Sequence, residues 1–315
     1  MDNTFNQIQE LLHQRAELYA RLKLIPYDGT AEVKPKGNEK YLYIRKRIAG
    51  KLTSTYVAPY SDELYQLLLK NTKESRAIKK EIRSVNKKLA LLGYVEAELT
   101  PEVVLNLDFA RANMKSNIYD QAILEGVTTT FPQTESIIDN GEVNGMTPTD
   151  VQKILNLKHA WEFILDKDVL LSDSSYYILC RIAKLVNEGF YDDGGRIRGV
   201  PVTIGGSSYI PPLPIETIIM EQLSAILSLE NESIDVAIEV CLYCMKTQIF
   251  NDGNKRAAVI FANHYLISHG GGLLVIPEKK VSQFKKLLVD YYEDKGFIKI
   301  KDFLKQECWK RYSDI

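Results

Sequence analysis

Hydrophobic residues recur at about every third or fourth position along most of the chain, which is the spacing of an amphipathic helix. This pattern predicts helices over residues 4–24, 61–93, 101–124, 147–165, 170–189, 214–227, 234–245, 256–268 and 281–292. Two stretches differ, because glycines interrupt short runs rich in aromatic or β-branched residues, and each predicts a β-hairpin: residues 41–57 and 194–206. The predicted fold class is therefore mostly α, with two small β-hairpins.

The helical pattern is interrupted between residues 93 and 100, and we place a domain boundary there. Residues 1–95 are predicted to form a helix–β-hairpin–helix region, and residues 96–315 a separate helical domain. The two helices that flank the first hairpin carry apolar seams near heptad spacing. They are therefore expected to pair as an antiparallel coiled coil with the hairpin at its tip.

The first hairpin and the residues leading into it are basic. Seven cations, Lys34, Lys36, Lys40, Arg45, Lys46, Arg47 and Lys51, outnumber Glu32 and Glu39, and Tyr41, Tyr43 and Tyr56 are interleaved with them. Cations beside aromatic rings suit nucleic acid. A protein partner is an alternative, and so is a solvated ribbon whose edge lysines prevent aggregation.

Composition narrows the class of protein without identifying its chemistry. The chain has 315 residues, of which 45% are hydrophobic and 26% charged, with a net charge of −1. These values describe an ordinary globular protein and argue against a dedicated nucleic-acid binder as a whole. No membrane association is expected, since no apolar run is long enough. The N-terminus lacks signal-peptide features, so a cytoplasmic location is expected. Cys241 and Cys244 lie in an apolar helix, which favours packing over metal binding.

The stretch Gln248-Ile-Phe-Asn-Asp-Gly-Asn-Lys-Arg256 concentrates candidate chemistry between two apolar helices. The second helix is predicted to open just after Gly253, so its unpaired N–H groups and the side chains of Lys255 and Arg256 could hold a phosphate. Asp252 offers an oxygen ligand for Mg²⁺ beside that phosphate. The alternative is a plain helix–turn–helix corner with solvated charges.

This stretch resembles the signature loop of the Fic/Doc family, whose pattern is His, an apolar residue, Phe, any residue, Asp or Glu, Gly, Asn, Gly or Lys, and Arg. The matching residues are Ile249, Phe250, Asp252, Gly253, Asn254, Lys255 and Arg256. Gln248 stands where the family has its catalytic His. The resemblance implies that Mg-ATP lies across the loop, that Asp252 holds Mg²⁺ and that Phe250 anchors the loop. It further implies nucleotide contacts from Gly253, Asn254, Lys255, Arg256 and Asn263.

The family transfers AMP to a Ser, Thr or Tyr hydroxyl of a target protein, and a Doc-like variant transfers the γ-phosphate instead. A carboxamide such as Gln248 accepts a hydrogen bond but has no useful basicity. Loss of a general base typically lowers the rate by about 10²–10⁴-fold. The chain is therefore expected to be either a slow or altered nucleotidyltransferase or a non-catalytic nucleotide- or peptide-binding regulator.

Two further features follow from the resemblance. Glu125 resembles the family's inhibitory Glu, but Gln121 and Val259 replace its usual Ser/Thr and Arg companions, and a Glu before a helix-ending glycine is the alternative interpretation. The second hairpin resembles the family's flap, which holds the target protein by strand addition through Arg198, Val200, Val202 and Ile204. An ordinary connecting hairpin is the alternative. Association into a homodimer is left open.

Overall fold

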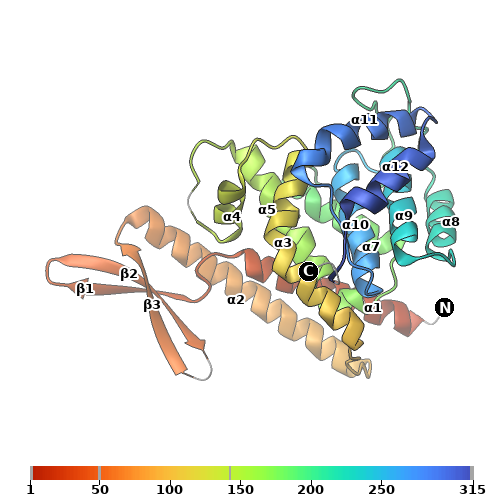
Figure 1. The fold of residues 1–315 in the computed structure, drawn as a ribbon. Coiled ribbons are helices and arrows are strands. Elements are labelled where there is room, and N and C mark those ends of the chain that lie inside the picture. Colours follow the sequence, from red (N-terminus) through yellow and green to blue (C-terminus); the bar gives the residue numbers. More distant parts are fainter. Residues whose placement is uncertain (1–2, 49–50, 142, 313–315) are drawn as a thin grey trace. The chain divides into compact units, whose positions relative to one another are not determined.

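The computed structural model describes residues 3–48, 51–141 and 143–312 of the chain. These residues form two compact units, Met1–Glu96 and Ala97–Ile315, which are described separately (Figure 1). Most described residues are helical, and the few strands form two small antiparallel sheets, which confirms the mostly α class and the N-terminal hairpin. No helix among the described residues combines the length and apolarity that a membrane span needs.

The first unit pairs two antiparallel helices, α1 (Asn3–Leu24) and α2 (Asp62–Leu91). Arg15 Nη1 donates to Asn86 Oδ1 over 3.0 Å, and further along Arg21 Nε lies 3.4 Å from a carboxylate oxygen of Glu74. Between the helices lies an apolar cluster of Leu11, Leu12, Val85 and Leu89. Both helices were predicted, whereas heptad packing of the coiled-coil type stays a prediction.

The same unit contains a three-stranded sheet in the order β1 (Thr30–Lys36), β2 (Glu39–Ile48), β3 (Lys51–Pro59). The predicted hairpin corresponds to β2 and β3. Strand β1 was not predicted, because Pro35 and the charged residues beside it weaken the strand pattern. Proline is tolerated there because β1 is an edge strand, where a missing N–H breaks no ladder on the open side.

The second unit is a bundle of helices around α10 (Asn254–Ser268), which lies between α3, α7 and α9 in Figure 1. The other helices are α3 (Pro101–Leu124), α4 (Phe131–Ile138), α5 (Pro148–Ile164), α6 (Lys167–Leu170), α7 (Tyr176–Val186), α8 (Glu216–Leu227), α9 (Ser233–Thr247), α11 (Val281–Tyr292) and α12 (Phe297–Phe303), with a 3₁₀ turn at Glu278–Lys280 and a π-helical turn at Leu304–Cys308. Strands β4 (Leu273–Leu274) and β5 (Trp309–Lys310) pair beside α10.

One predicted helix, residues 170–189, is shorter in the structure, where α7 spans Tyr176–Val186. Helix α6 ends at Leu170, and α7 begins only after Ser175, whose hydroxyl accepts a hydrogen bond from the N–H of Ile178. A serine cap at this place satisfies a free helical N–H and so sets a new start. Helices α4 and α12 were not predicted.

The cysteines of the second unit are free thiols, and Cys241, Cys244 and Cys308 are buried. Burial disfavours the charged thiolate and raises the pKa of Cys241 and of Cys308 to about 12. These thiols are therefore packing residues, as expected for the Cys241–Cys244 pair.

Candidate functional site

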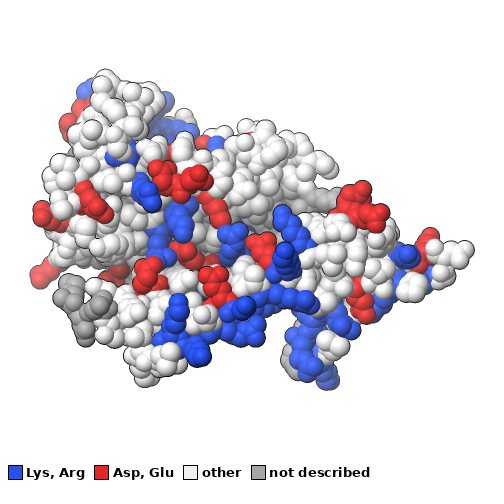
Figure 2. All heavy atoms as spheres, turned by 180° about the vertical axis from the view of Figure 1, so that it is seen from behind, with Lys and Arg blue, Asp and Glu red and all other residues white. Residues whose placement is uncertain are grey.

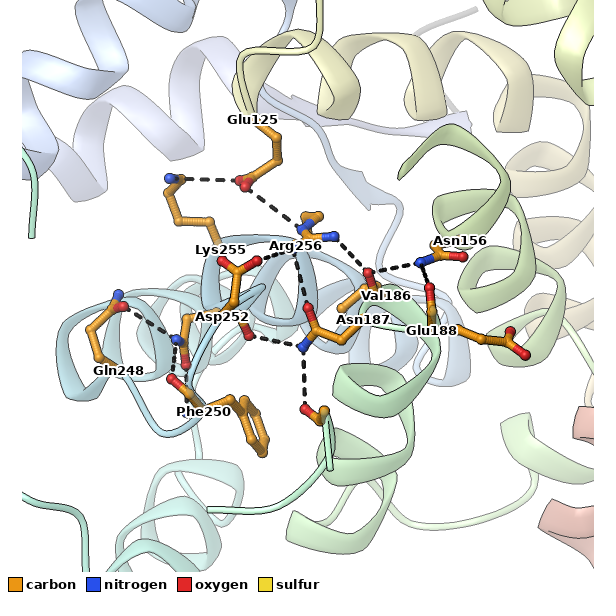
Figure 3. Close-up of polar contacts among 12 residues, drawn as sticks. Glu125, Asn156, Val186, Asn187, Glu188, Gln248, Phe250, Asp252, Lys255 and Arg256 are labelled. Atoms are coloured by element: carbon orange, nitrogen blue, oxygen red, sulfur yellow. Dashed lines mark hydrogen bonds and ion pairs between the residues drawn. The ribbon is translucent and has the colours of Figure 1, made fainter. Parts of the chain in front are cut away.

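Two residues in the left-handed backbone region turn the chain between α9 and α10. Gln248 has φ 48° and ψ 63°, and Gly253 has φ 73°. The side chain of Asn254 closes the loop between them: its Oδ1 accepts from the N–H of Phe250 over 2.9 Å, and its Nδ2 donates to the Phe250 carbonyl over 2.8 Å (Figure 3). Phe250 is buried below the loop. Asn254, expected to contact the nucleotide, thus has its amide committed to the shape of the loop.

The C-terminal end of α7 closes against this loop. Asn187 is fully buried, and its Nδ2 donates to the Asp252 carbonyl over 2.9 Å and to the Gly194 carbonyl over 3.2 Å. A Cβ atom on Gly253 would lie 2.8 Å from Asn187 Oδ1 and 3.1 Å from a methyl of Val186. Glycine is therefore required at 253 for two reasons, its positive φ and the lack of space.

A matched pair of glycine substitutions separates these two reasons. Gly126 also has a positive φ (77°), but nothing lies within 4 Å of its Cβ position. Both alanine variants strain the backbone, and only Gly253→Ala adds overpacking, so it should lower the free energy of unfolding by about 1–3 kcal/mol more than Gly126→Ala does. Urea denaturation of both variants measures the difference. Equal losses would show that Asn187 and Val186 move aside at no cost.

Helix α10 begins without a side-chain cap. Its first helical hydrogen bond runs from the N–H of Ala257 to the Gly253 carbonyl over 2.8 Å, so the three preceding N–H groups, on residues 254–256, have no helical acceptor. Unpaired N–H groups and the helix dipole together favour an anion at this end. The lack of a cap leaves this position open to a ligand.

Glu125, at the end of α3, faces the start of α10. Its two carboxylate oxygens lie 3.8 Å from Lys255 Nζ and 3.7 Å from Arg256 Nε. Figure 3 marks both contacts. These are ion-pair distances that are too long for hydrogen bonds. Glu125 Oε1 and Arg256 Nε are buried, and neither has a hydrogen-bond partner. The Glu125 carboxylate thus forms ion pairs with Lys255 and Arg256 but accepts no hydrogen bond from either.

Arg256 is only 2% exposed, and most of its donors are already used. Nη1 donates to the Val186 carbonyl over 2.6 Å, and Nη2 donates to Asn187 Oδ1 (3.2 Å) and to Asp252 Oδ2 (3.0 Å). Arg256 therefore fastens the loop to α7, with Nε uncommitted. Lys255, whose side chain is 34% exposed, is the more accessible cation.

Asp252 is the candidate metal ligand, and its side chain is 51% exposed. Across residues 3–48, 51–141 and 143–312, no three His, Cys, Asp or Glu side chains converge as a metal site would require. Magnesium is commonly held by one or two carboxylates together with phosphate oxygens and water. Asp252 fits an ion shared with a bound polyphosphate, and does not fit a site built from protein groups alone.

The side chain of Gln248 is held at both ends. Nε2 donates to the Met245 carbonyl over 2.6 Å, and Oε1 accepts from Asn254 Nδ2 over 3.2 Å. His264 of α10 is fully buried, with its ring nitrogens 2.9 Å from the Val169 carbonyl and 2.8 Å from the Ser174 hydroxyl. Burial lowers its pKa to about 4. His264 is therefore a structural residue and not a substitute base.

The predicted flap hairpin is wrong in its secondary structure. All of residues 194–215 are described, and none of them lies in a strand. Prolines at 201, 211, 212 and 214 remove the N–H groups that a strand ladder needs. The buried guanidinium of Arg198 shapes the segment instead. It donates to the carbonyls of Gln248 (2.5 Å), Val200 (2.8 Å), Pro211 (3.3 Å) and Pro212 (2.6 Å).

The other flap residues remain at the surface to different degrees. Val200 is 56% exposed, and Val202 and Ile204 are half-buried. Further along the same loop, Ile210, Leu213 and Ile215 are more than half exposed. The loop therefore presents an apolar strip, although it offers no strand ladder.

Asn263 is not at the loop. It is fully buried, its Nδ2 donates to the carbonyls of Val259 and Leu274, and its Oδ1 accepts from the N–H of Leu274 over 3.0 Å. Asn263 therefore joins α10 to β4 and has no free polar atom for a nucleotide.

Sequence reasoning missed Asn187. The one available signal is an asparagine at the end of the apolar run before Glu188-Gly189, a place where helices end. Asn156 donates to the carbonyls of Val186 (3.3 Å) and Glu188 (2.8 Å) and supports this corner from α5.

Comparison with known proteins relates part of each unit to a family model. A model of the Fic/DOC family matches residues 173–266, which include the loop and α10, and a domain of unknown function (DUF6788) matches residues 5–66. A comparison with curated proteins returned no match.

Several solved structures share the fold. Fic-1 (residues 134–508) from C. elegans is 18% identical with a TM-score of 0.51, covering 78% of this chain and 73% of that one. A Fic family protein from Desulfovibrio desulfuricans G20 is 18% identical with a TM-score of 0.51, covering 67% and 74%. A Fic domain containing signaling protein from Bacteroides thetaiotaomicron is 19% identical with a TM-score of 0.50, covering 60% and 75%. Residues 173–266 thus match the Fic/DOC family and the chain shares the Fic fold, with Gln248 at the first position of the loop that resembles the family's signature.

Proposed function

We propose that the 248–256 loop binds ATP or another nucleotide together with Mg²⁺, and that the native protein transfers AMP to target-protein hydroxyls slowly or not at all. Fic proteins generally bind nucleotides or transfer nucleotide monophosphates, and this proposal makes that general function specific. The observation that carries it is the uncapped start of α10, where unpaired N–H groups lie beside Lys255 and the unsatisfied Nε of Arg256.

In this proposal each loop residue has a defined task. Lys255 and the N–H groups at the start of α10 neutralise and position the polyphosphate. Asp252 shares a bound Mg²⁺, which supplies charge stabilisation at the phosphates when present. The Oε1 atom of Gln248 can accept a hydrogen bond from the attacking hydroxyl but cannot take its proton. In this proposal, AMP transfer is slow because residue 248 cannot accept the proton of the attacking hydroxyl.

A non-catalytic regulator is the second candidate. The two ends of the Gln248 amide are already bonded, to the Met245 carbonyl and to Asn254, which favours a residue that holds the loop closed over one that serves a reaction. Such a protein would bind Mg-ATP and present the apolar strip of residues 200–215 to a partner. Both candidates bind Mg-ATP, so titration of Mg-ATP into the native protein tests that binding. Only a label-transfer assay distinguishes the enzyme from the regulator.

Glu125 is expected to weaken nucleotide binding. Its carboxylate lies near the position that a phosphate would take beside Lys255 and Arg256. Like charges about 4 Å apart repel by on the order of 1–4 kcal/mol between water and a protein surface. Glu125→Gln should therefore bind Mg-ATP at least about fivefold more tightly, as measured by titration calorimetry.

The control for this prediction is Glu221→Gln, which removes the same charge from the exposed surface of α8. It should leave the affinity unchanged. Equal affinities for the native protein and Glu125→Gln would show that the nucleotide does not approach Glu125.

A further inference from the structure

The two units of the chain have opposite charge. Residues 1–96 contain 18 Lys and Arg against 11 Asp and Glu, a net charge of +7, so residues 97–315 carry −8 within a total of −1. Figure 2 shows lysines and arginines gathered at the β2–β3 end of the sheet and along α2. A basic unit attached to an acidic one is the pattern of a chain with a separate polyanion-binding part.

The strand register sorts the side chains of the sheet onto two faces. Alternate residues of a strand point to opposite sides. Leu42 and Ile44 of β2 are buried and form a cluster with Leu68 of α2. Tyr43 and Arg45 therefore project from the other face, which we call the outer face.

Strand pairing brings further residues onto the outer face. In the register, Tyr56 lies opposite Tyr43, and Lys34 lies opposite Tyr41. By the same alternation, the outer face contains three tyrosines flanked by cations from β1 and β2: Lys34, Lys36, Tyr41, Tyr43, Arg45, Arg47 and Tyr56.

The three tyrosine rings form one aromatic cluster. The ring centroids of Tyr43 and Tyr56 are 5.6 Å apart, those of Tyr41 and Tyr56 are 6.1 Å apart, and Tyr56 is 51% exposed. Lys34 Nζ lies 4.5 Å from the centre of the Tyr43 ring. Tyr41 and Tyr43 are half-buried, so the exposed ring of Tyr56 and the accessible parts of its two neighbours are available to a flat ligand.

The acidic residues of this face are already paired. Glu32 accepts a hydrogen bond from the Ser54 hydroxyl over 2.9 Å and lies 3.5 Å from Lys34 Nζ. Glu39 accepts a hydrogen bond from the Tyr41 hydroxyl. Lys36 and Arg45 are exposed at the two sides of the tyrosine cluster. The face therefore combines a positive rim with an aromatic centre.

We propose that the outer face of this sheet binds single-stranded nucleic acid, with phosphates at the cationic rim and bases stacked on the tyrosines. An acidic peptide would pair with the cations but would have no flat group to stack on the tyrosine rings. A duplex keeps its bases stacked on one another and so also gains little from exposed rings. Single strands use both, because every base has a face that can stack and every link carries a phosphate.

The test uses the full-length protein and fluorescently labelled 20-nucleotide strands, one of DNA and one of RNA, with binding followed by anisotropy at several salt concentrations. Tyr43→Thr/Tyr56→Thr keeps strand-forming residues and removes the rings. It should weaken binding roughly 5- to 150-fold if one base is lost from the stack. Lys36→Gln/Arg45→Gln should weaken binding and reduce the slope of log affinity against log salt by about 1.4, for two lost phosphate contacts.

The matched control is Lys73→Gln/Lys80→Gln, which removes two exposed charges from α2 and no aromatic ring. It should keep most of the affinity. A larger loss in the control than in the two sheet variants would overturn the proposal. The proposal would also be wrong if duplex DNA or polyglutamate bound as tightly as single strands and the tyrosine changes did not affect that binding. It would be wrong as well if neither the DNA nor the RNA strand bound at 50 mM salt. A preference between DNA and RNA would tell which polymer is the natural ligand.

Discussion

Gln248→His is expected to raise AMP transfer by about 10²–10⁴-fold over the native protein, because it restores a proton acceptor at the position where the family has its catalytic His. The backbone permits the change: residue 248 has φ 48°, and His is among the residues enriched in the left-handed region. The measurement is transfer of label from ATP labelled at the α-phosphate, with Mg²⁺, to lysate proteins or to the chain itself. Glu125→Gln in the same chain should increase the signal further.

Gln248→Asn is the matched control, because Asn also tolerates a positive φ but has no basicity. It should show no gain. Native transfer equal to that of Gln248→His would mean that the reaction needs no base at residue 248. Silence from every variant, with Mg-ATP binding intact, would exclude AMP transfer and direct attention to transfer of the γ-phosphate, which label at that position would detect.

Arg256→Met is expected to lower the free energy of unfolding of the second unit by about 3–5 kcal/mol, even without a nucleotide. The guanidinium is 2% exposed and donates to Val186, Asn187 and Asp252, so its removal leaves buried acceptors unpaired and takes away one of the two cations beside the Glu125 carboxylate. Both tryptophans, Trp161 and Trp309, lie in this unit, so their fluorescence during urea denaturation measures its stability.

Lys255→Met is the control for Arg256→Met. Lys255 is the neighbouring cation, its side chain is 34% exposed, and it meets the same carboxylate at 3.8 Å. Partly exposed ion pairs contribute little, so its loss should cost under about 1 kcal/mol while still weakening Mg-ATP binding. Equal stability of the two variants would mean that Arg256 serves the ligand and not the fold.

The sequence was sufficient to predict most helices because their ends carry local signals. Helix α3 begins at Pro101 after Thr100, whose hydroxyl accepts from the N–H of Val103. The strands were harder to predict. Strand β1 is short and contains Pro35, and its pairing with β2 compensates for a weak pattern of its own. The flap segment, residues 194–206, differs in the opposite way. Its β-branched residues and glycines predict a hairpin, but the contacts of Arg198 and the nearby prolines hold it as a loop without strands.

The candidate loop could be located from sequence, but the partners of its residues could not. Asn254 and Arg256 were expected to face a ligand, and both spend most of their hydrogen bonds on the protein itself. Asn254 donates to the Phe250 carbonyl, and Arg256 donates to the Val186 carbonyl in a distant helix. Every residue has such a carbonyl, so no residue type marks the contact.

The Val186 carbonyl illustrates which positions of the protein tolerate substitution. This single oxygen accepts from Arg256 of α10 and from Asn156 of α5. Any residue at 186 supplies the same oxygen, so substitution there need not disturb either bond, whereas a change at 156 or 256 removes a donor outright. A comparison of homologues would see two constrained positions and miss the atom that couples them. Substitution at positions 156 and 256 is therefore restrained by the backbone carbonyl of residue 186, which every amino acid at that position would supply.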